Sequence, residues 1–131
     1  MLDTSAYSAF MRGHARIVSA IRRADRIVLS PIAIGELKAG FLGGSRVQEN
    51  NAQLAELLSS PRVHLVDLTP KTSERYAVIV DFLSRAGTPV PTNDVWIAAS
   101  AMEHGLVVLT TDGHYRRIPQ VVAQCFDLPP A

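Results

Sequence analysis

Short apolar runs rich in β-branched residues occur at several points along the chain, each stopped by a proline, a glycine or a polar residue. Such runs are too short for helices and predict buried strands. The predicted strands are Arg26–Ser30, Val63–Leu68, Leu106–Leu109 and a weaker one over Val122–Phe126. Met1 and Leu2 predict only the stub of a further strand ahead of Asp3.

Between these runs, apolar residues return every three or four positions, as in helices with one buried face. The predicted helices are a short one ending near Met11, then His14–Ala24, Pro31 to about Phe41, Arg46–Ser59, Thr72–Ala86 and Asn93–His104. Alternating strands and helices favour a parallel sheet covered by helices on both faces. We therefore expect an α/β fold, a three-layer α/β/α sandwich with a mostly parallel central sheet, formed by a single domain over residues 1–131.

Composition narrows this picture in three ways. Apolar residues make up 47% and charged residues 19% of the 131 residues, which is a globular mixture. The formal net charge of +1 gives no argument for a polyanionic partner, so such a partner needs local evidence. The single cysteine, Cys125, excludes an intramolecular disulfide and a cysteine-based zinc cluster. Without a signal peptide or a long apolar segment, we expect a cytoplasmic protein with no membrane partner.

The helix predicted over Asn93–His104 is apolar on nearly every face, yet it begins with Asn93 and Asp94. A helix apolar all round is buried, so its start is expected to point into a cleft. A lone ionised carboxylate there is costly and needs a cation or another partner. The alternative is that Asp94 only complements the helix dipole from the first turn.

Glu36 raises the same question in the middle of the helix that starts at Pro31. Its neighbours at helical spacing are small or apolar, namely Ile32, Ala33, Ala39 and Gly40. Both flanks of Glu36 are therefore expected to be covered. The alternative is an ordinary solvated surface glutamate.

Asp3 follows the first strand stub, and Asp112 follows the run Leu106–Leu109 after two threonines. Taken alone, Asp3 is equally well explained as a helix N-cap and Asp112 as the first residue of a turn. In an open parallel sheet, however, the carboxyl ends of the strands are the edge where ligands bind. We therefore expect Asp3, Glu36, Asp94 and Asp112 to converge there.

Four neighbouring carboxylates repel one another and stay ionised only beside positive charge. No lysine or arginine is adjacent in sequence to Asp3, Asp94 or Glu36, and Lys38 falls on a different helical face from Glu36. A metal ion is the expected counter-charge, and an oxygen-only ligand set selects Mg²⁺ or Mn²⁺ over zinc. Such a site suits hydrolysis of phosphodiester bonds.

Four segments together resemble a known family. They are LDTSAYSAF at Leu2–Phe10, IGEL at Ile34–Leu37, NDVWIAASA at Asn93–Ala101 and LTTDGHYRRIP at Leu109–Pro119. In this order they resemble the PIN-domain ribonucleases, and among these the VapC toxins of bacterial toxin–antitoxin pairs, over essentially the whole chain. The resemblance implies a PIN-like fold and an Mg²⁺- or Mn²⁺-dependent endoribonuclease that acts on tRNA or another structured RNA. It assigns metal binding and catalysis to Asp3, Glu36, Asp94 and Asp112.

The resemblance also implies partners and supporting residues. A cognate VapB-type antitoxin is expected to neutralise the protein, and the protein is expected to form a homodimer. Candidate residues for contacting that partner are Phe10, Met11, Phe41 and Leu42, with ordinary core packing as the alternative. Residues expected to orient the carboxylates or the substrate are Thr4, Ser5, Asn93 and Thr110, each of which is equally well a plain cap. Candidate RNA contacts are Arg12, His14, His114, Arg116 and Arg117, with a solvated turn as the alternative for the last three.

One departure from the family pattern concerns the candidate site. Many relatives have a second acid two positions after the Asp112 equivalent, where this chain has His114, so a possible extra ligand is missing. Two other functions remain open at this point. The chain is alternatively a catalytically inactive PIN-like binding or scaffold module, or a phosphoryl-transfer enzyme with Asp3 as nucleophile. The second would require a lysine near a strand end, which Leu106–Asp112 does not provide.

Overall fold

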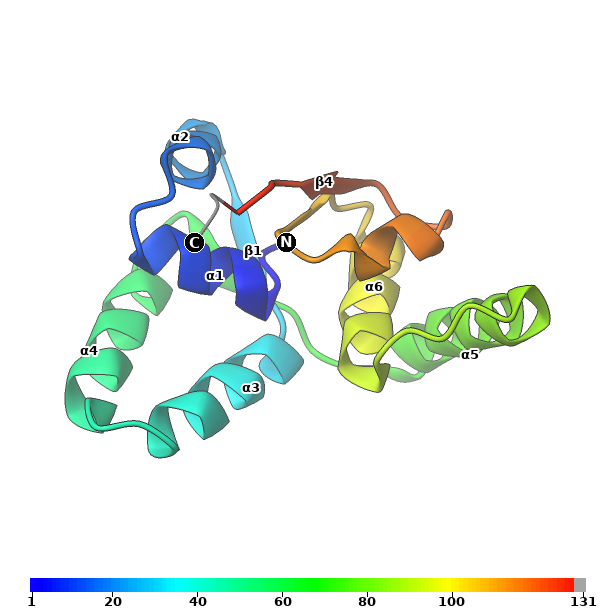
Figure 1. The fold of residues 1–131 in the computed structure, drawn as a ribbon, viewed down its shortest axis with the longest axis horizontal. Coiled ribbons are helices and arrows are strands. Elements are labelled where there is room, and N and C mark those ends of the chain that lie inside the picture. Colours follow the sequence, from blue (N-terminus) through cyan, green and yellow to red (C-terminus); the bar gives the residue numbers. More distant parts are fainter. Residues whose placement is uncertain (129–131) are drawn as a thin grey trace.

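The computed structural model describes residues 1–128, over which helices and short strands alternate (Figure 1). The elements in chain order are α1 (Thr4–Met11), α2 (Ala15–Arg23), β1 (Ile27–Leu29), α3 (Pro31–Leu42), α4 (Val47–Leu58), β2 (Val63–Leu65), α5 (Pro70–Ala86), α6 (Thr92–His104), β3 (Val108–Thr110), the 3-10 helix η1 (Gly113–Arg117) and β4 (Ala123–Cys125). All six predicted α-helices are present, with ends within two residues of the predicted ones. The 3-10 helix η1 was not predicted.

The residues Met1 to Asp3 join two parallel strand pairs, β1–β2 and β3–β4. The Leu2 amide donates to the Val28 carbonyl oxygen at 2.9 Å, and the Asp3 amide donates to the Leu109 carbonyl oxygen at 3.2 Å. Leu2 also forms a parallel bridge with Leu109. The five segments thus follow the order β2, β1, Met1–Asp3, β3, β4, and they confirm the predicted fold with parallel strands.

Side chains from alternate strand positions enter two separate cores, because successive residues of a strand point to opposite faces. Leu2, Ile27 and Leu29 pack with apolar residues of α1 and α2. Met1 and Val28 pack on the other side, with residues of α5 and α6. Helices therefore cover both faces, as the three-layer prediction required.

Helix α5 extends away from the sheet and packs along α6 (Figure 1). The rings of Tyr76 and Trp96 stack between the two helices with centroids 4.0 Å apart. The Thr72 hydroxyl donates to Glu103 Oε1 at 2.5 Å. Helix α5 begins at Pro70 rather than Thr72, because Thr69 and Thr72 form a capping box around its first turn.

Two predicted strands are wrong in their bounds for identifiable reasons. Strand β2 ends at Leu65 instead of Leu68, since it is an edge strand paired only with β1 and its outer residues face solvent. Strand β3 starts at Val108 instead of Leu106. The Leu106 amide donates to Ala101 and still closes α6 behind Gly105, whose φ of 63° permits the turn.

None of the helices among residues 1–128 combines the length and apolar character that a membrane crossing requires.

Truncating Leu2 should test whether Met1–Asp3 form a central strand. Leu2 is 1% exposed, so we expect Leu2→Ala to lower the free energy of unfolding by about 2–5 kcal/mol through lost burial and an unfilled cavity. Urea denaturation followed by circular dichroism measures this. The matched control is Leu65→Ala, at 56% exposure, which should change stability by less than about 1 kcal/mol. Equal losses for the two variants would contradict the assignment.

Candidate active site

Asp3 ends the short first strand and caps helix α1. Its Oδ1 accepts hydrogen bonds from the Ala6 amide and the Ser5 hydroxyl, both at 2.8 Å. Its Oδ2 accepts one from the Thr110 hydroxyl at 2.6 Å. Asp3 therefore is the N-cap of α1, as the alternative predicted, but capping uses only its Oδ1 atom. Because a carboxylate oxygen accepts about two hydrogen bonds, Oδ2 keeps a free lone pair for another partner.

Burial raises the pKa of Asp3 above its ordinary value of 3.8. The hydrogen bonds from Thr110, Ala6 and Ser5 act in the opposite direction, and the charge of Asp112 adds to the rise. These donors are neutral, so they orient the carboxylate without neutralising it. Asp3 is thus held in place in a position that is costly for an ionised group.

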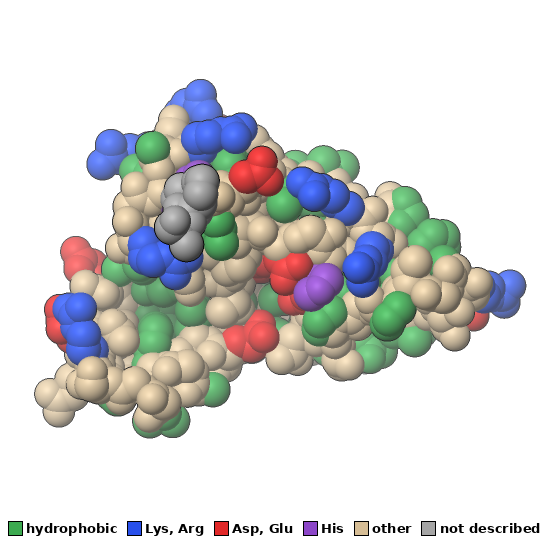
Figure 2. Space-filling view, in the orientation of Figure 1, with side chains coloured by type: hydrophobic (Ala, Val, Ile, Leu, Met, Phe, Trp, Pro, Cys, Tyr) green, Lys and Arg blue, Asp and Glu red, His purple; other side chains and the backbone are tan. Residues whose placement is uncertain are grey.

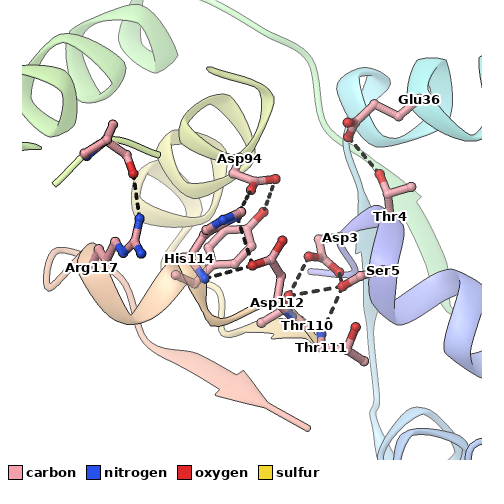
Figure 3. Close-up of polar contacts among 12 residues, drawn as sticks. Asp3, Thr4, Ser5, Glu36, Asp94, Thr110, Thr111, Asp112, His114 and Arg117 are labelled. Atoms are coloured by element: carbon pink, nitrogen blue, oxygen red, sulfur yellow. Dashed lines mark hydrogen bonds and ion pairs between the residues drawn. The ribbon is translucent and has the colours of Figure 1, made fainter. Parts of the chain in front are cut away.

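Asp94 and Asp112 lie on either side of His114 (Figure 3). Asp94 comes from the first turn of α6, and Asp112 caps η1 by accepting from the His114 amide at 2.9 Å. The His114 ring atom Nδ1 is 3.1 Å from Asp94 Oδ2 and 2.9 Å from Asp112 Oδ1. One possible ligand atom from each of the three residues lies within 4.8 Å of the others. His114, predicted as an RNA contact, thus lies inside the acidic cluster.

The pKa of Asp94 is also raised, first by burial and then by the charges of Asp112 and Asp3, while the hydrogen bond and charge of His114 oppose the rise. Tyr115 lies directly behind this group, with its hydroxyl 3.5 Å from Asp94 Oδ1. Burial raises the pKa of Tyr115 far above its usual range, and the nearby charges of Asp3, Asp94, Glu36 and Asp112 raise it further. The Tyr115 hydroxyl therefore lies on the buried side of the acidic group, next to Asp94.

Glu36 approaches this group from α3, on the opposite side from Asp94 (Figure 3). The Thr4 hydroxyl donates to Glu36 Oε1 at 2.8 Å, which leaves Oε2 available. Glu36 is half-buried, but the expectation that both flanks are covered was wrong, because Ala39 and Gly40 are exposed. Lys38 donates to Asn51 Oδ1 and is turned away from the site.

Figure 2 shows acidic side chains gathered beside a histidine near the middle of one face, with basic side chains both close to that histidine and toward the edges. Among residues 1–128, no lysine or arginine forms an ion pair with any of the four carboxylates. The hydrogen bonds to Asp3 and Glu36 thus come from hydroxyl and backbone amide groups, and the nearby basic side chains do not pair with the carboxylates.

Three of the four residues expected to orient the carboxylates make such contacts. Thr4 holds Glu36, and Ser5 and Thr110 hold Asp3. The hydroxyls of Ser5 and Thr110 lie 3.2 Å apart, so they link the start of α1 to the end of β3. Asn93 is exposed rather than turned into a cleft, and its side chain makes no hydrogen bond to another described residue.

Of the other predicted RNA contacts, His14 is used in contacts within the protein, whereas the three arginines are exposed. Both ring nitrogens of His14 are used, since Nδ1 accepts from the Ile17 amide and Nε2 lies 2.9 Å from the Asp127 carbonyl oxygen. His14 therefore serves as a helix cap that also holds the C-terminal segment. Arg12 and Arg116 are exposed. Arg117 is exposed too, although one of its nitrogens donates to the Pro89 carbonyl oxygen.

Sequence reasoning missed two features of the site. Tyr115 was not selected, because a single aromatic residue in a polar loop carries no periodic signal of burial. The Thr111 amide, which donates to the Ser5 hydroxyl at 2.9 Å, is a backbone contact between residues distant in sequence. A turn signal at Asp112–Gly113 indicated a bend, but not that the bend returns His114 and Tyr115 to Asp94.

The chemistry of the donor set fits a divalent cation. Asp3 Oδ2 and Glu36 Oε2 each have free lone pairs, and Asp94 and Asp112 add further carboxylate oxygens. Burial raises the pKa of both Asp3 and Asp94, so the folded chain holds negative charge at a cost that a dication would offset.

Comparison with known proteins identifies the family to which the chain belongs. The PIN domain model matches residues 1–121. Ribonuclease VapC4 of Mycobacterium tuberculosis is 34% identical over 93 residues, 71% of this chain and 72% of the relative. Ribonuclease VapC1 of Haemophilus influenzae is 32% identical over 114 residues, 84% of each chain. The structure of DNA-bound VapBC from Salmonella typhimurium, 28% identical, superposes with a TM-score of 0.83 over 95% of each chain.

These matches agree with the fold described above, in which parallel strands alternate with helices. The chain belongs to the PIN domain family and is related to the VapC ribonuclease toxins of VapBC toxin–antitoxin systems.

Proposed function

We propose that the protein is a metal-dependent endoribonuclease that hydrolyses phosphodiester bonds of tRNA or another structured RNA in the cytoplasm. The observation that carries this proposal is the close group of Asp94, Asp112 and His114 at the carboxyl edge of the sheet, with Asp3 linked to it through Thr110 and Glu36 facing it from α3. Relatives that share this fold are named as ribonucleases, which supports RNA as the substrate class.

In this proposal the four carboxylates hold Mg²⁺ or Mn²⁺. A bound cation of this kind lowers the pKa of a water molecule and offsets charge on the attacked phosphate. The hydroxyls of Ser5 and Thr110 fix the orientation of Asp3, and Thr4 does the same for Glu36. Tyr115 presents its hydroxyl to Asp94 from the buried side. These contacts restrict the carboxylates to one arrangement before substrate binds.

The exposed guanidinium groups supply the proposed contacts to the RNA backbone. Arg116 and Arg117 follow directly from the site on η1, and Arg12 lies just beyond the end of α1. Guanidinium groups bind phosphate through charge and paired hydrogen bonds, without reading base sequence. The small number of aromatic residues, 6% of the chain, favours recognition of RNA shape and backbone over base stacking.

A cognate antitoxin is the proposed regulatory partner, because several solved relatives are VapBC or toxin–antitoxin complexes. Two adjoining hollows between α1 and the helices α3 and α4 share Met11 and Gln53, and both are partly lined by aromatic side chains. Phe10 lines one hollow and Phe41 the other, so the predicted contact residues surround this surface. Leu42 is 74% exposed nearby. Homodimer formation remains part of the proposal.

Substitution of the buried aspartates tests the enzymatic proposal. We expect Asp3→Asn and Asp94→Asn each to lower Mn²⁺-dependent RNA cleavage by at least about 100-fold, since loss of a ligand exceeds the effect of losing an outer hydrogen-bond partner. The measurement is cleavage of total RNA by purified protein, with Mn²⁺ or Mg²⁺ and with EDTA.

The matched control is Asp67→Asn, which changes an exposed aspartate outside the cluster and should leave cleavage unchanged. Wild-type cleavage by either buried variant, or cleavage that persists in EDTA, contradicts the proposal. Absence of cleavage by the wild type on all RNAs would favour the inactive binding module instead.

The raised pKa values predict how stability depends on pH in the metal-free protein. The folded state binds more protons than the unfolded state above pH 3.8, so stability present at low pH is lost as pH rises through the raised pKa values of Asp3 and Asp94. We expect wild type to lose stability relative to Asp3→Asn as pH rises from about 4 to about 8, measured by urea denaturation in EDTA. Saturating Mn²⁺ should abolish this relative loss. A constant difference between the two proteins across the range would show that Asp3 titrates normally.

A further inference from the structure

The ring of His114 is fixed in place by its own backbone. The His114 amide donates to Asp112 Oδ1 at 2.9 Å and starts η1, which orients the residue relative to Asp112. The side chain is 36% exposed, so one edge of the ring faces solvent while Nδ1 faces the carboxylates. A histidine that only binds phosphate would have both ring nitrogens free, whereas Nδ1 of His114 already faces two carboxylates.

The Nδ1 atom has a single position for a partner, either a proton or an electron acceptor. It faces two carboxylate oxygens at 2.9 and 3.1 Å, and a bare nitrogen lone pair at that distance from two anionic oxygens is repulsive. A proton or a cation must therefore lie between Nδ1 and the two carboxylate oxygens. A proton satisfies this need with no metal present, and a dication satisfies it by accepting electron pairs from all three.

We propose that His114 Nδ1, together with Asp94 and Asp112, is a direct ligand of the divalent cation in this site and shifts its preference from Mg²⁺ toward Mn²⁺. This inference rests on the proposed function and adds a nitrogen ligand to the predicted all-oxygen set. Mg²⁺ is a hard ion that strongly favours oxygen, whereas imidazole suits transition metals. The acid expected two positions after Asp112 is thus replaced by a ligand of different chemistry.

Asp3 and Glu36 are not members of the three-residue group that contains His114. Their free oxygens face the cluster from α1 and α3, where Ser5, Thr110 and Thr4 hold them. The nitrogen therefore joins only the α6–η1 side of the site. A substitution at His114 should accordingly alter cation selectivity while Asp3 and Glu36 keep their contacts.

The test is pulsed electron paramagnetic resonance of Mn²⁺ bound to the whole protein without RNA. We expect directly bound nitrogen to produce a hyperfine coupling in wild type, and no such coupling in His114→Gln. The control is His64→Gln, which changes an exposed histidine on β2 and should keep the coupling. Isothermal titration should show the ratio of Mn²⁺ to Mg²⁺ affinity falling by at least about tenfold in His114→Gln and in His114→Asp.

Three results would overturn the inference. Wild type that binds Mn²⁺ without nitrogen coupling, while Asp94→Asn abolishes binding, leaves the proposed function intact and shows that His114 only donates a hydrogen bond. An unchanged ratio of Mn²⁺ to Mg²⁺ affinity in both His114 variants would also show that His114 is not a ligand of the cation. If wild type binds neither ion at all, both this inference and the metal-dependent function fail together.

Discussion

The pairing of Met1–Asp3 between β1 and β3 is the constraint on which the rest of the structure depends. Three backbone hydrogen bonds, from Leu2 to Val28, from Asp3 to Leu109 and from Leu109 to Met1, join two strand pairs that otherwise share no ladder. The same pairing places Asp3 at the carboxyl end of the central strand, 3% exposed and within reach of Thr110 at the end of β3. The segment that connects the two strand pairs therefore also carries Asp3 into the acidic site.

Much of the fold was predictable because its signals are local. Capping residues and prolines marked helix starts, and the helix starting at Pro31 ends at Leu42 before Gly43, as its sequence indicated. The errors arose where tertiary pairing decided the outcome. Val63–Leu68 has the composition of a strand, but only β1 is available to pair with it, so the strand stops at Leu65. The sequence predicted only the stub of a strand at Met1 and Leu2, and no local signal showed that Met1–Asp3 lie at the centre of the sheet.

The candidate carboxylates were selected because each is an acid among apolar residues or at a strand end, although the structure leaves Ala39 and Gly40 beside Glu36 exposed. The hydrogen bonds that hold these carboxylates were only partly predictable from the sequence. Thr4, Ser5 and Thr110 lie beside the predicted acids in sequence, but that Thr4 reaches Glu36, 32 residues away, depends on how α1 packs against α3. His114 shows the same limit, since the turn that brings its ring to Asp94 is a property of η1 and not of any residue pattern.

Tyr115 and the three hydroxyl residues around the carboxylates have a consequence for the order of assembly. Because none of these donors carries charge and no lysine or arginine among residues 1–128 forms an ion pair with the carboxylates, the ionised carboxylates give the pocket a negative field that the protein offsets only weakly. A nucleic-acid backbone arriving first would be repelled by that field, whereas a small dication would be drawn in. Sequential loading, ion before polynucleotide, is therefore the downhill route into the pocket, and RNA affinity should itself depend on free divalent ion concentration.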